Sequence, residues 1–320
     1  MTFRLFDSKA DQLFRNVSFD QIPESPSDWI WLDVVNPTSN EIDQIGRLFA
    51  FHPLAIENVQ RPHQRPKVEE YPTHLLVVLY SLTLSDGDQR PILRELAVFI
   101  TAHAVVTVQY NAIEEITFAA RRWAEHCQGE RQVDPAMLVY TISDTIVDSY
   151  FPAMDAIGDR IEDLEALVFS NDGTGTVEQV FRLKRVLLEM RRLIAPTREV
   201  FNAFTRREFP LLGGTSVTYF QDVYDHVIRV TDTIDGYRDI LSTIIDVHLT
   251  VVSNDLNQSV RTLTVASIIL MTLALIAGLY GMNFRYIPGL DWRFGYVGAL
   301  AGMAIIAVAL GWTFRRLRWW

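Results

Sequence analysis

The sequence lacks most features that would indicate a disulfide-stabilised or enzymatic protein. Cys127 is the single cysteine in 320 residues, which excludes an intrachain disulfide and a cysteine-based zinc cluster. There is no glycine-rich phosphate loop, no Gly-x-Ser-x-Gly elbow and no nucleophile paired with a base. His52, His63 and His74 follow one another at intervals of 11, a spacing that suits metal ligands on neither a helix nor a strand, so we expect them to be structural. We therefore predict no enzymatic activity and no organic cofactor.

Charged residues are absent from two apolar runs, residues 263–282 and 294–314. Each run has about 20 residues, enough for a helix to cross the roughly 30 Å of hydrocarbon in a bilayer. Two segments cannot close a barrel, so we predict a helical hairpin in a lipid bilayer. Arg261 precedes the first run, and Arg315 and Arg316 follow the second. These flanks favour a multi-pass protein of the cell inner (plasma) membrane with both termini cytoplasmic.

Proline is absent from residues 216–282, which favours one long helix. If helical throughout, the segment is about 100 Å long and projects a membrane span from a cytosolic body. Apolar residues recur along it at spacings of four and three, as in a heptad seam. Such a seam needs partners, and identical subunits around one axis are the simplest arrangement. The seam comprises Val223, Val227, Val230, Ile234, Tyr237, Leu241, Ile244, His248 and Val251.

The charge is unevenly distributed along the chain. The formal net charge is -10, but residues 256–320 carry six Arg and one Asp, so the preceding residues carry a net charge of -15. An acidic soluble part argues against nucleic acid or anionic lipid as its main partner. The same charge is compatible with the attraction of cations.

Local patterns divide the chain and predict the fold class α+β. Strand-like apolar runs come first, and helical periodicity follows from about residue 133. In the helical part we expect a kink or a restart at Pro152 and Gly158. The returning helix carries basic residues that can face the acids of its partner, namely Lys184, Arg185, Arg191 and Arg192. The predicted segments are a cytosolic α/β domain (1–132), an acidic antiparallel helical pair (133–214), a stalk helix (215–262), a first transmembrane helix (263–282), an extracytoplasmic loop (283–293), a second transmembrane helix (294–314) and a basic cytoplasmic tail (315–320).

Small or polar side chains recur along one face of the first membrane run. Two explanations are open. Small residues let helix backbones approach closely, so the stripe is typical of a helix–helix interface. It also suits the wall of a narrow pore built by several copies, although the frequency of interfaces favours the first explanation. The stripe consists of Thr264, Ser267, Met271, Ala274 and Gly278.

The motif Tyr280-Gly281-Met282-Asn283-Phe284 closes the first membrane run. In this position it resembles the Gly-Met-Asn signature of CorA-type divalent cation channels. Residues 219–226 and 237–240 resemble the stalk of that family, and residues 52–58 and 63–69 resemble its soluble domain. The resemblance implies a funnel-shaped homopentamer that moves Mg2+, with Co2+ or Ni2+ as further ions.

The resemblance also assigns the ion path. Gly281, Met282 and Asn283 match the selectivity filter, where a ring of amide oxygens binds an ion that keeps its waters. A C-terminal helix cap by Gly281 and Asn283 is the structural alternative. Apolar residues that line the path can close it by expelling water from the pore. The resemblance gives Asn257, Leu263 and Met271 as pore-lining or gate residues. The stripe adds Thr264, Ser267, Ala274 and Gly278 to the predicted pore lining.

Members of this family regulate themselves with divalent ions bound between subunits, so the resemblance gives Mg2+ a regulatory role as well as a transported one. Asp222 matches one acid of that site. The family's second acid is replaced here by Asn58, which follows Glu57. An amide carries no charge, so either Glu57 substitutes or the site binds metal weakly.

The outer loop departs from the family as well. Arg285 and Gly289 stand where acids are frequent, which leaves Asp291 as the only carboxylate of the loop. Weaker attraction of cations makes Zn2+ transport an alternative function. An alternative of another class is a membrane-tethered sensor or scaffold that conducts nothing.

Overall fold

The computed structural model describes residues 2–6, 13–22, 29–85, 90–129, 135–169, 175–206, 209–212, 217–283, 293–317 and 319. The chain divides into two compact units, residues 1–243 and 244–320, and each is described by itself. Helix α7 (Val217–Tyr280) contributes to both units.

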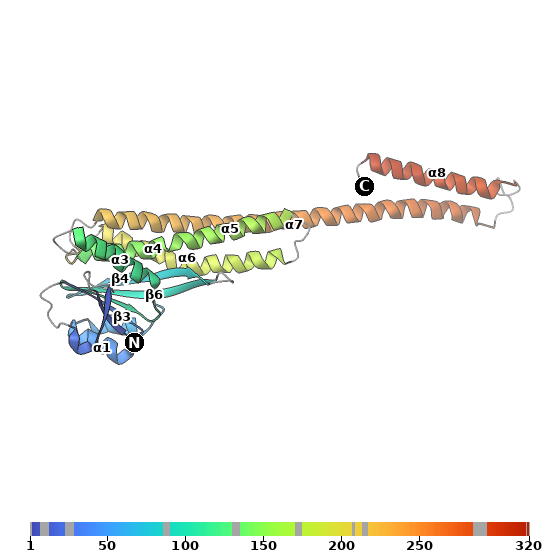
Figure 1. The fold of residues 1–320 in the computed structure, drawn as a ribbon. Helices are drawn as coiled ribbons and strands as arrows, with labels where there is room; N and C mark the ends of the chain where they lie inside the picture. Colours follow the sequence, from blue (N-terminus) through green and yellow to red (C-terminus); the bar gives the residue numbers. More distant parts are fainter. Residues whose placement is uncertain are drawn as a thin grey trace. The chain divides into compact units, whose positions relative to one another are not determined.

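Seven strands form one mixed sheet in the first unit (Figure 1). Their order across the sheet is β2-β1-β3-β7-β6-β5-β4. Strands β3 and β7 are parallel, and all other neighbours are antiparallel. The strands are β1 (Thr2–Phe6), β2 (Phe14–Val17), β3 (Ile30–Val35), β4 (Lys67–Glu70), β5 (Leu75–Leu84), β6 (Pro91–Ile100) and β7 (Ala104–Gln109).

The central strands are apolar because both faces of the sheet are covered. The first eight residues of β5 are all buried. Leu76 and Val78 belong to the core on one face, while Leu75 and Val77 point to the other because successive side chains alternate. Strands buried on both faces therefore read as unbroken apolar runs, which is how the sequence predicts β5.

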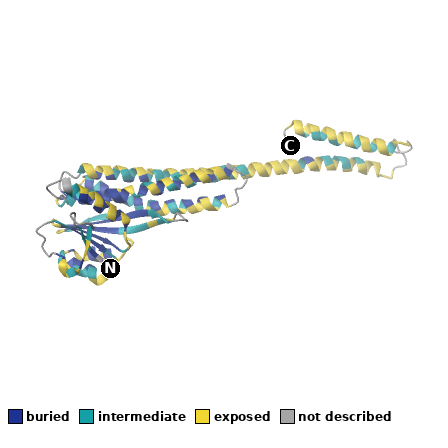
Figure 2. Ribbon diagram, viewed as in Figure 1, coloured by how far each residue is buried: buried dark blue, intermediate teal, exposed yellow. Residues whose placement is uncertain are grey.

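Helices pack on both faces of this sheet (Figures 1 and 2). Helices α1 (Ser39–Leu48) and α2 (Pro53–Gln60) cover one face, and Ile42, Ile45 and Ile56 anchor them in its core. Helix α1 begins with a capping box that the sequence itself shows, since the Glu41 carboxylate accepts the Thr38 N–H at 2.7 Å. The other face carries α3 (Glu114–Gly129), α4 (Pro135–Asp148), α5 (Tyr150–Phe169) and α6 (Thr176–Arg206).

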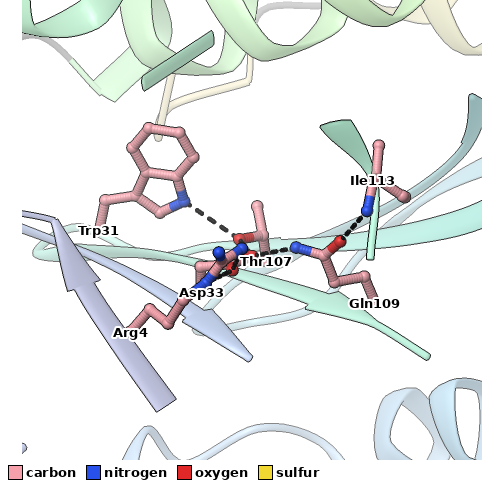
Figure 3. Close-up of polar contacts among 6 residues, drawn as sticks. All are labelled: Arg4, Trp31, Asp33, Thr107, Gln109 and Ile113. Carbon is pink, nitrogen blue, oxygen red and sulfur yellow. Dashed lines mark hydrogen bonds and ion pairs between the residues drawn. The ribbon is translucent and has the colours of Figure 1, made fainter. Parts of the chain in front are cut away.

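A buried polar network ties the middle of the sheet together (Figure 3). The Asp33 carboxylate accepts hydrogen bonds from Thr107 at 2.7 Å and Gln109 at 2.8 Å, and the Arg4 guanidinium donates to its second oxygen at 2.8 Å. Asp33 is fully buried, and burial raises its pKa although Arg4 lowers it. Gln109 extends the network by accepting the Ile113 N–H. Such a charge is tolerable only because each carboxylate oxygen has partners.

The helical part contains three helices, so the prediction of a helical pair is wrong in number. The chain breaks at Ser149, between α4 and α5, so the helix restarts close to the predicted Pro152, whereas Gly158 lies inside α5. Pro152 lies in the first turn of α5, where its missing N–H costs no helical hydrogen bond. A Cβ on Gly158 would lie 2.6 Å from the Tyr237 hydroxyl, so this glycine leaves room for α7.

Two of the predicted basic residues of α6, Lys184 and Arg191, contact α7 and not the acids of α5, which corrects the prediction for these two. The Arg191 guanidinium binds the Asp235 carboxylate at 2.7 Å. The Lys184 ammonium donates to the Ser242 hydroxyl at 2.8 Å. These contacts hold α6 along the part of α7 that belongs to the first unit.

That part of α7 is already covered by its own chain. Phe201 and Phe204 of α6 pack their rings against Phe220, and Tyr237 lies over Gly158 of α5. The prediction that this stretch of the seam needs other subunits is therefore wrong. The seam residues with no exposed surface in one chain are Val223, Val227, Val230, Ile234 and Leu241.

The second unit consists mainly of two apolar helices, as predicted. The C-terminal part of α7 and helix α8 (Gly295–Arg316) run in opposite directions (Figure 1). Each contains a window apolar enough to cross a membrane, with mean hydropathy 2.3 and 2.0. Only 6% of the first window and none of the second is buried within the chain. They are therefore not core helices of a soluble domain, and they need an apolar environment outside this chain.

Candidate ion pathway and regulatory metal site

The C-terminal part of α7 has one covered face and one open face. Val265 is buried, and Ile269, Leu273 and Ile276 are half-buried. These positions recur every three or four residues and so share one face. Since α8 is the other helix of this unit, we assign this covered face to contact with α8.

The stripe of small and polar residues lies on the open face. At 100° per residue its members centre about 180° from the covered face. Ser267, Met271, Ala274 and Gly278 are exposed, and only Thr264 is half-buried. An added Cβ on Gly278 would meet nothing within 4 Å. The stripe is therefore not the interface between the two apolar helices of one chain, and it is available to other copies.

The remaining predicted pathway residues are exposed in the same segment. Leu263 has 68% and Met271 72% of its surface exposed, and both belong to a contiguous apolar stretch that is exposed in one chain. Asn257 is exposed one to two turns before Leu263. All three lie on α7, so one rigid helix carries them.

Helix α7 ends immediately before the predicted filter. The Gly281 N–H bonds to the Ala277 carbonyl at 3.0 Å and the Gly278 carbonyl at 3.2 Å, which tightens the last turn. Gly281 is not in the left-handed conformation, so the end is not a glycine cap of that kind. Asn283 is exposed, and its side chain makes no hydrogen bond to any residue that the structure describes. The capping alternative thus lacks its contacts. Asp291, the predicted carboxylate of the outer loop, lies outside the described residues, as do Arg285 and Gly289.

Asp222 lies beside a cluster that sequence reasoning missed. The ligand atoms of Asp144, Asp148 and His226 all lie within 4.8 Å of one another. His226 Nδ1 is 3.6 Å from Asp148 Oδ1, and His226 Nε2 is 3.9 Å from Asp222 Oδ1. The group thus comprises two residues of α4 and two of α7.

The donors of this cluster fit a divalent ion. His226 Nδ1 is buried without a hydrogen-bond partner among the described residues. Burial raises the pKa of Asp148, and the Asp144 carboxylate raises it further. A bound cation would offset the repulsion between the carboxylates and would give the unpaired His226 nitrogen a partner. Carboxylates suit Mg2+, and an imidazole adds affinity for Co2+, Ni2+ or Zn2+.

An arginine competes for one of these donors. The Arg122 guanidinium of α3 binds Asp144 at 2.8 Å and donates to Thr145 at 3.1 Å. The Asp144 side chain is buried, but the Arg122 side chain is 45% exposed, so only the carboxylate of this pair is shielded from water.

A spacing signal for the missed residues was present in the sequence. Asp144 and Asp148 are four residues apart, and so are Asp222 and His226, which places each pair on one helix face. Only packing shows that the two faces meet.

Glu57 and Asn58 do not join Asp222 within one chain. Both belong to α2, on the opposite face of the sheet from α4 (Figure 1). Glu57 pairs with Arg61 at 3.0 Å. The Asn58 amide donates to Glu69 at 3.0 Å.

Comparisons with known proteins agree with this architecture. A family model described as CorA-like Mg2+ transporter protein matches residues 26–316. The cobalt/magnesium transport protein CorA of Thermotoga maritima is 36% identical over 292 residues, which cover 91% of this chain and 83% of that protein. Its namesake from Methanocaldococcus jannaschii is 23% identical over 293 residues, 91% of each chain. The complete structure of the CorA magnesium transporter from that organism superposes with a TM-score of 0.81 at 20% identity, covering 99% of this chain and 98% of the other.

Proposed function

Because this chain belongs to the CorA-like Mg2+ transporter family, we propose that it transports divalent cations across the cell inner membrane. Mg2+ is the proposed substrate, with Co2+ and Ni2+ as further ions. Relatives in this family are named as transporters, which supports a non-enzymatic function. Identical subunits, five by family resemblance, place α7 around an axial pore, and α8 lies outside it toward lipid.

One observation carries this proposal: the small-polar face of α7 is opposite its covered face and, apart from the half-buried Thr264, is exposed. A pore wall needs small or polar side chains, since large apolar side chains would block a hydrated ion. Met271 and Leu263 supply apolar constrictions that can dewet and close. A membrane-tethered scaffold would need no such face.

Asn283 is the proposed selectivity residue. It follows the last turn of α7, and its amide has no partner in the described part of the chain. A ring of amide oxygens binds the waters of Mg2+ without replacing them, which suits an ion that dehydrates reluctantly. Gly281 and Met282 place this ring at the helix end.

Uptake of Mg2+ by proteoliposomes tests the pathway. We expect Asn283→Ala to lower Mg2+ uptake at least about tenfold, because the ring loses its oxygens. Asn283→Gln keeps an amide and should retain more uptake than the alanine variant. Wild-type uptake equal to that of empty liposomes would support the sensor or scaffold, and preferred uptake of Zn2+ over Mg2+ in competition would support the zinc alternative.

We further propose that cytosolic divalent ions close the channel by binding at Asp222. The neighbouring cluster of Asp144, Asp148 and His226 supplies additional donors. Glu57 and Asn58 of an adjacent subunit complete the site in this proposal, with Glu57 giving the charge that Asn58 lacks. Occupancy would then tie one subunit to the next and hold the stalk helices in a closed arrangement.

A further inference from the structure

Helix α8 carries an apolar groove with a volume of about 460 Å3 on its surface. Val308 is 73% and Trp312 62% exposed, so no described part of the chain covers them. Figure 2 shows that exposed residues extend along the whole of this helix. The residues that line the groove are all apolar and all belong to α8: Ala304, Ile305, Val308, Ala309 and Trp312.

The groove leads to a cation. The Arg316 guanidinium lies over the Trp312 ring, 5.2 Å from its centroid. Ala304, Val308, Trp312 and Arg316 follow one another at intervals of four, so they form one row along the helix surface. A cation–π contact positions a guanidinium without neutralising its charge. The apolar groove therefore ends beside a positively charged group that is held in place.

No carboxylate of the same helix competes for this charge. Residues 295–316 contain no Asp and no Glu. Arg315 is exposed beside Arg316, and neither arginine forms an ion pair with any residue that the structure describes. Both charges are therefore available to an anion from outside the chain. Guanidinium groups match the oxygens of a phosphate well.

The length of the row matches one leaflet of a bilayer. Ala304 and Arg316 are 12 residues apart, or about 18 Å along a helix. One leaflet contributes about half of the roughly 30 Å of hydrocarbon, or about 15 Å. Trp312 and Trp319 flank the two arginines, as is typical of the level where lipid headgroups begin. An acyl chain in the groove would therefore bring its phosphate to the height of Arg316.

We propose that this face of α8 binds an anionic phospholipid, with one acyl chain in the groove and the phosphate beside Arg315 and Arg316. The inference rests on the proposed function, in which α8 faces lipid. Charge favours a lipid over the same face of a second copy, because two such faces would bring like charges together. The site would make the leaflet at the C-terminal end of α8 selective for negatively charged headgroups.

Lipid titration of the purified full-length protein, measured by native mass spectrometry, tests the proposal. We expect dioleoyl phosphatidylglycerol to bind at least about tenfold more tightly than dioleoyl phosphatidylcholine. Arg315→Gln combined with Arg316→Gln should remove this preference. The matched control is Arg261→Gln with Arg293→Gln, which removes the same charge from exposed positions outside the groove and should keep the preference. Equal headgroup preference in these two double variants would overturn the proposal.

The acyl chain is tested separately in the wild-type protein, so this comparison stands even if an arginine variant fails to fold. Dihexanoyl phosphatidylglycerol has the same headgroup but chains too short for the groove, and it should bind at least about tenfold more weakly than the dioleoyl lipid. Equal binding of the two would overturn the role of the groove.

Ala304→Phe fills the groove and should weaken binding of the dioleoyl lipid while the number of subunits stays the same. A changed number of subunits with unchanged lipid affinity would assign the groove to another copy and overturn the proposal. The titration contains EDTA and no transported ion. A failed lipid result therefore leaves the transport proposal standing, and a failed uptake assay leaves the lipid site standing.

Discussion

The two parts of α7 carry apolar residues at similar spacing but in different surroundings. In the first unit, Val227 and Leu241 are completely buried by helices of the same chain. In the second unit, Leu256, Leu263 and Met271 remain more than 60% exposed. One helix can therefore present the same pattern to two environments. An apolar seam must be shielded from water, but its pattern alone does not tell whether the same chain, another subunit or lipid shields it.

The largest effect is expected at the buried charge of the first unit. Arg4→Met leaves the fully buried Asp33 without its cation and should lower the free energy of unfolding by about 3–5 kcal/mol. Hydrogen exchange of β3 and β7 amides reports this unit alone. Arg15→Met, on the exposed side of neighbouring β2, is the control and should change little. Equal protection in both variants would show that the ion pair is dispensable.

The same substitution in both parts of α7 tests the comparison directly. Leu241→Ala removes a buried side chain and should cost about 2–5 kcal/mol of unfolding free energy. Leu256→Ala removes an exposed one and should leave the first unit within about 0.5 kcal/mol of wild type.

If other subunits cover Leu256, that variant should instead lower the stability of the oligomer, measured by native mass spectrometry. A loss of stability of the first unit in both variants would remove the distinction between the two parts.

A pH dependence should appear in the first unit and originate from His74. Burial and the neighbouring His52 lower the pKa of His74 to about 4, below the roughly 6.5 of an unfolded histidine. The unfolded state then binds more protons between these values, so stability is complete above about pH 6.5. It falls as the pH drops toward about 4, by at most about 1.4 kcal/mol per pH unit.

Denaturant unfolding at several pH values measures this slope. His74→Phe should flatten it, because phenylalanine has no titrating group and can keep the ring contacts with Phe51 and Tyr71. His103→Phe, at an exposed turn, should leave the slope as it is. An unchanged slope in the first variant would assign the effect to other groups.

The smallest effect concerns the metal cluster. Arg122→Gln frees the Asp144 carboxylate and should raise the affinity for Co2+ or Mn2+ by about tenfold, the equivalent of one strong hydrogen bond. Isothermal calorimetry measures it. Arg121→Gln, its exposed neighbour on α3, should change nothing. Weaker binding in the Arg122 variant would mean that this arginine orders the site.

Several elements were predictable because their signals are local. The apolar run of β5, the Thr38 and Glu41 start of α1, the unbroken α7 and the apolar α8 all follow from neighbouring residues. The short edge strands β2 and β4 were not predicted. Each has four residues and carries charged or polar side chains, so its pairing depends on the strand beside it.

The candidate site was predictable in part. Gly281, Met282 and Asn283 are recognisable by their position after an apolar run, and the stripe by its helical spacing. Asp144 and Asp148 were missed because two acids on one side of a helix usually lie on a solvent-exposed face. They become candidate metal ligands only in combination with His226, which lies more than 70 residues away in the sequence.

The sequence by itself determined the long helix, the two apolar spans and the family, since these depend on periodicity, hydropathy and a contiguous motif. Tertiary structure alone decided which helix covers the seam of α7, which face of α7 turns from α8, and which acids meet His226. The physical reason is that helical and strand periods are set within a few residues, whereas the partner of a face is set by packing between distant segments.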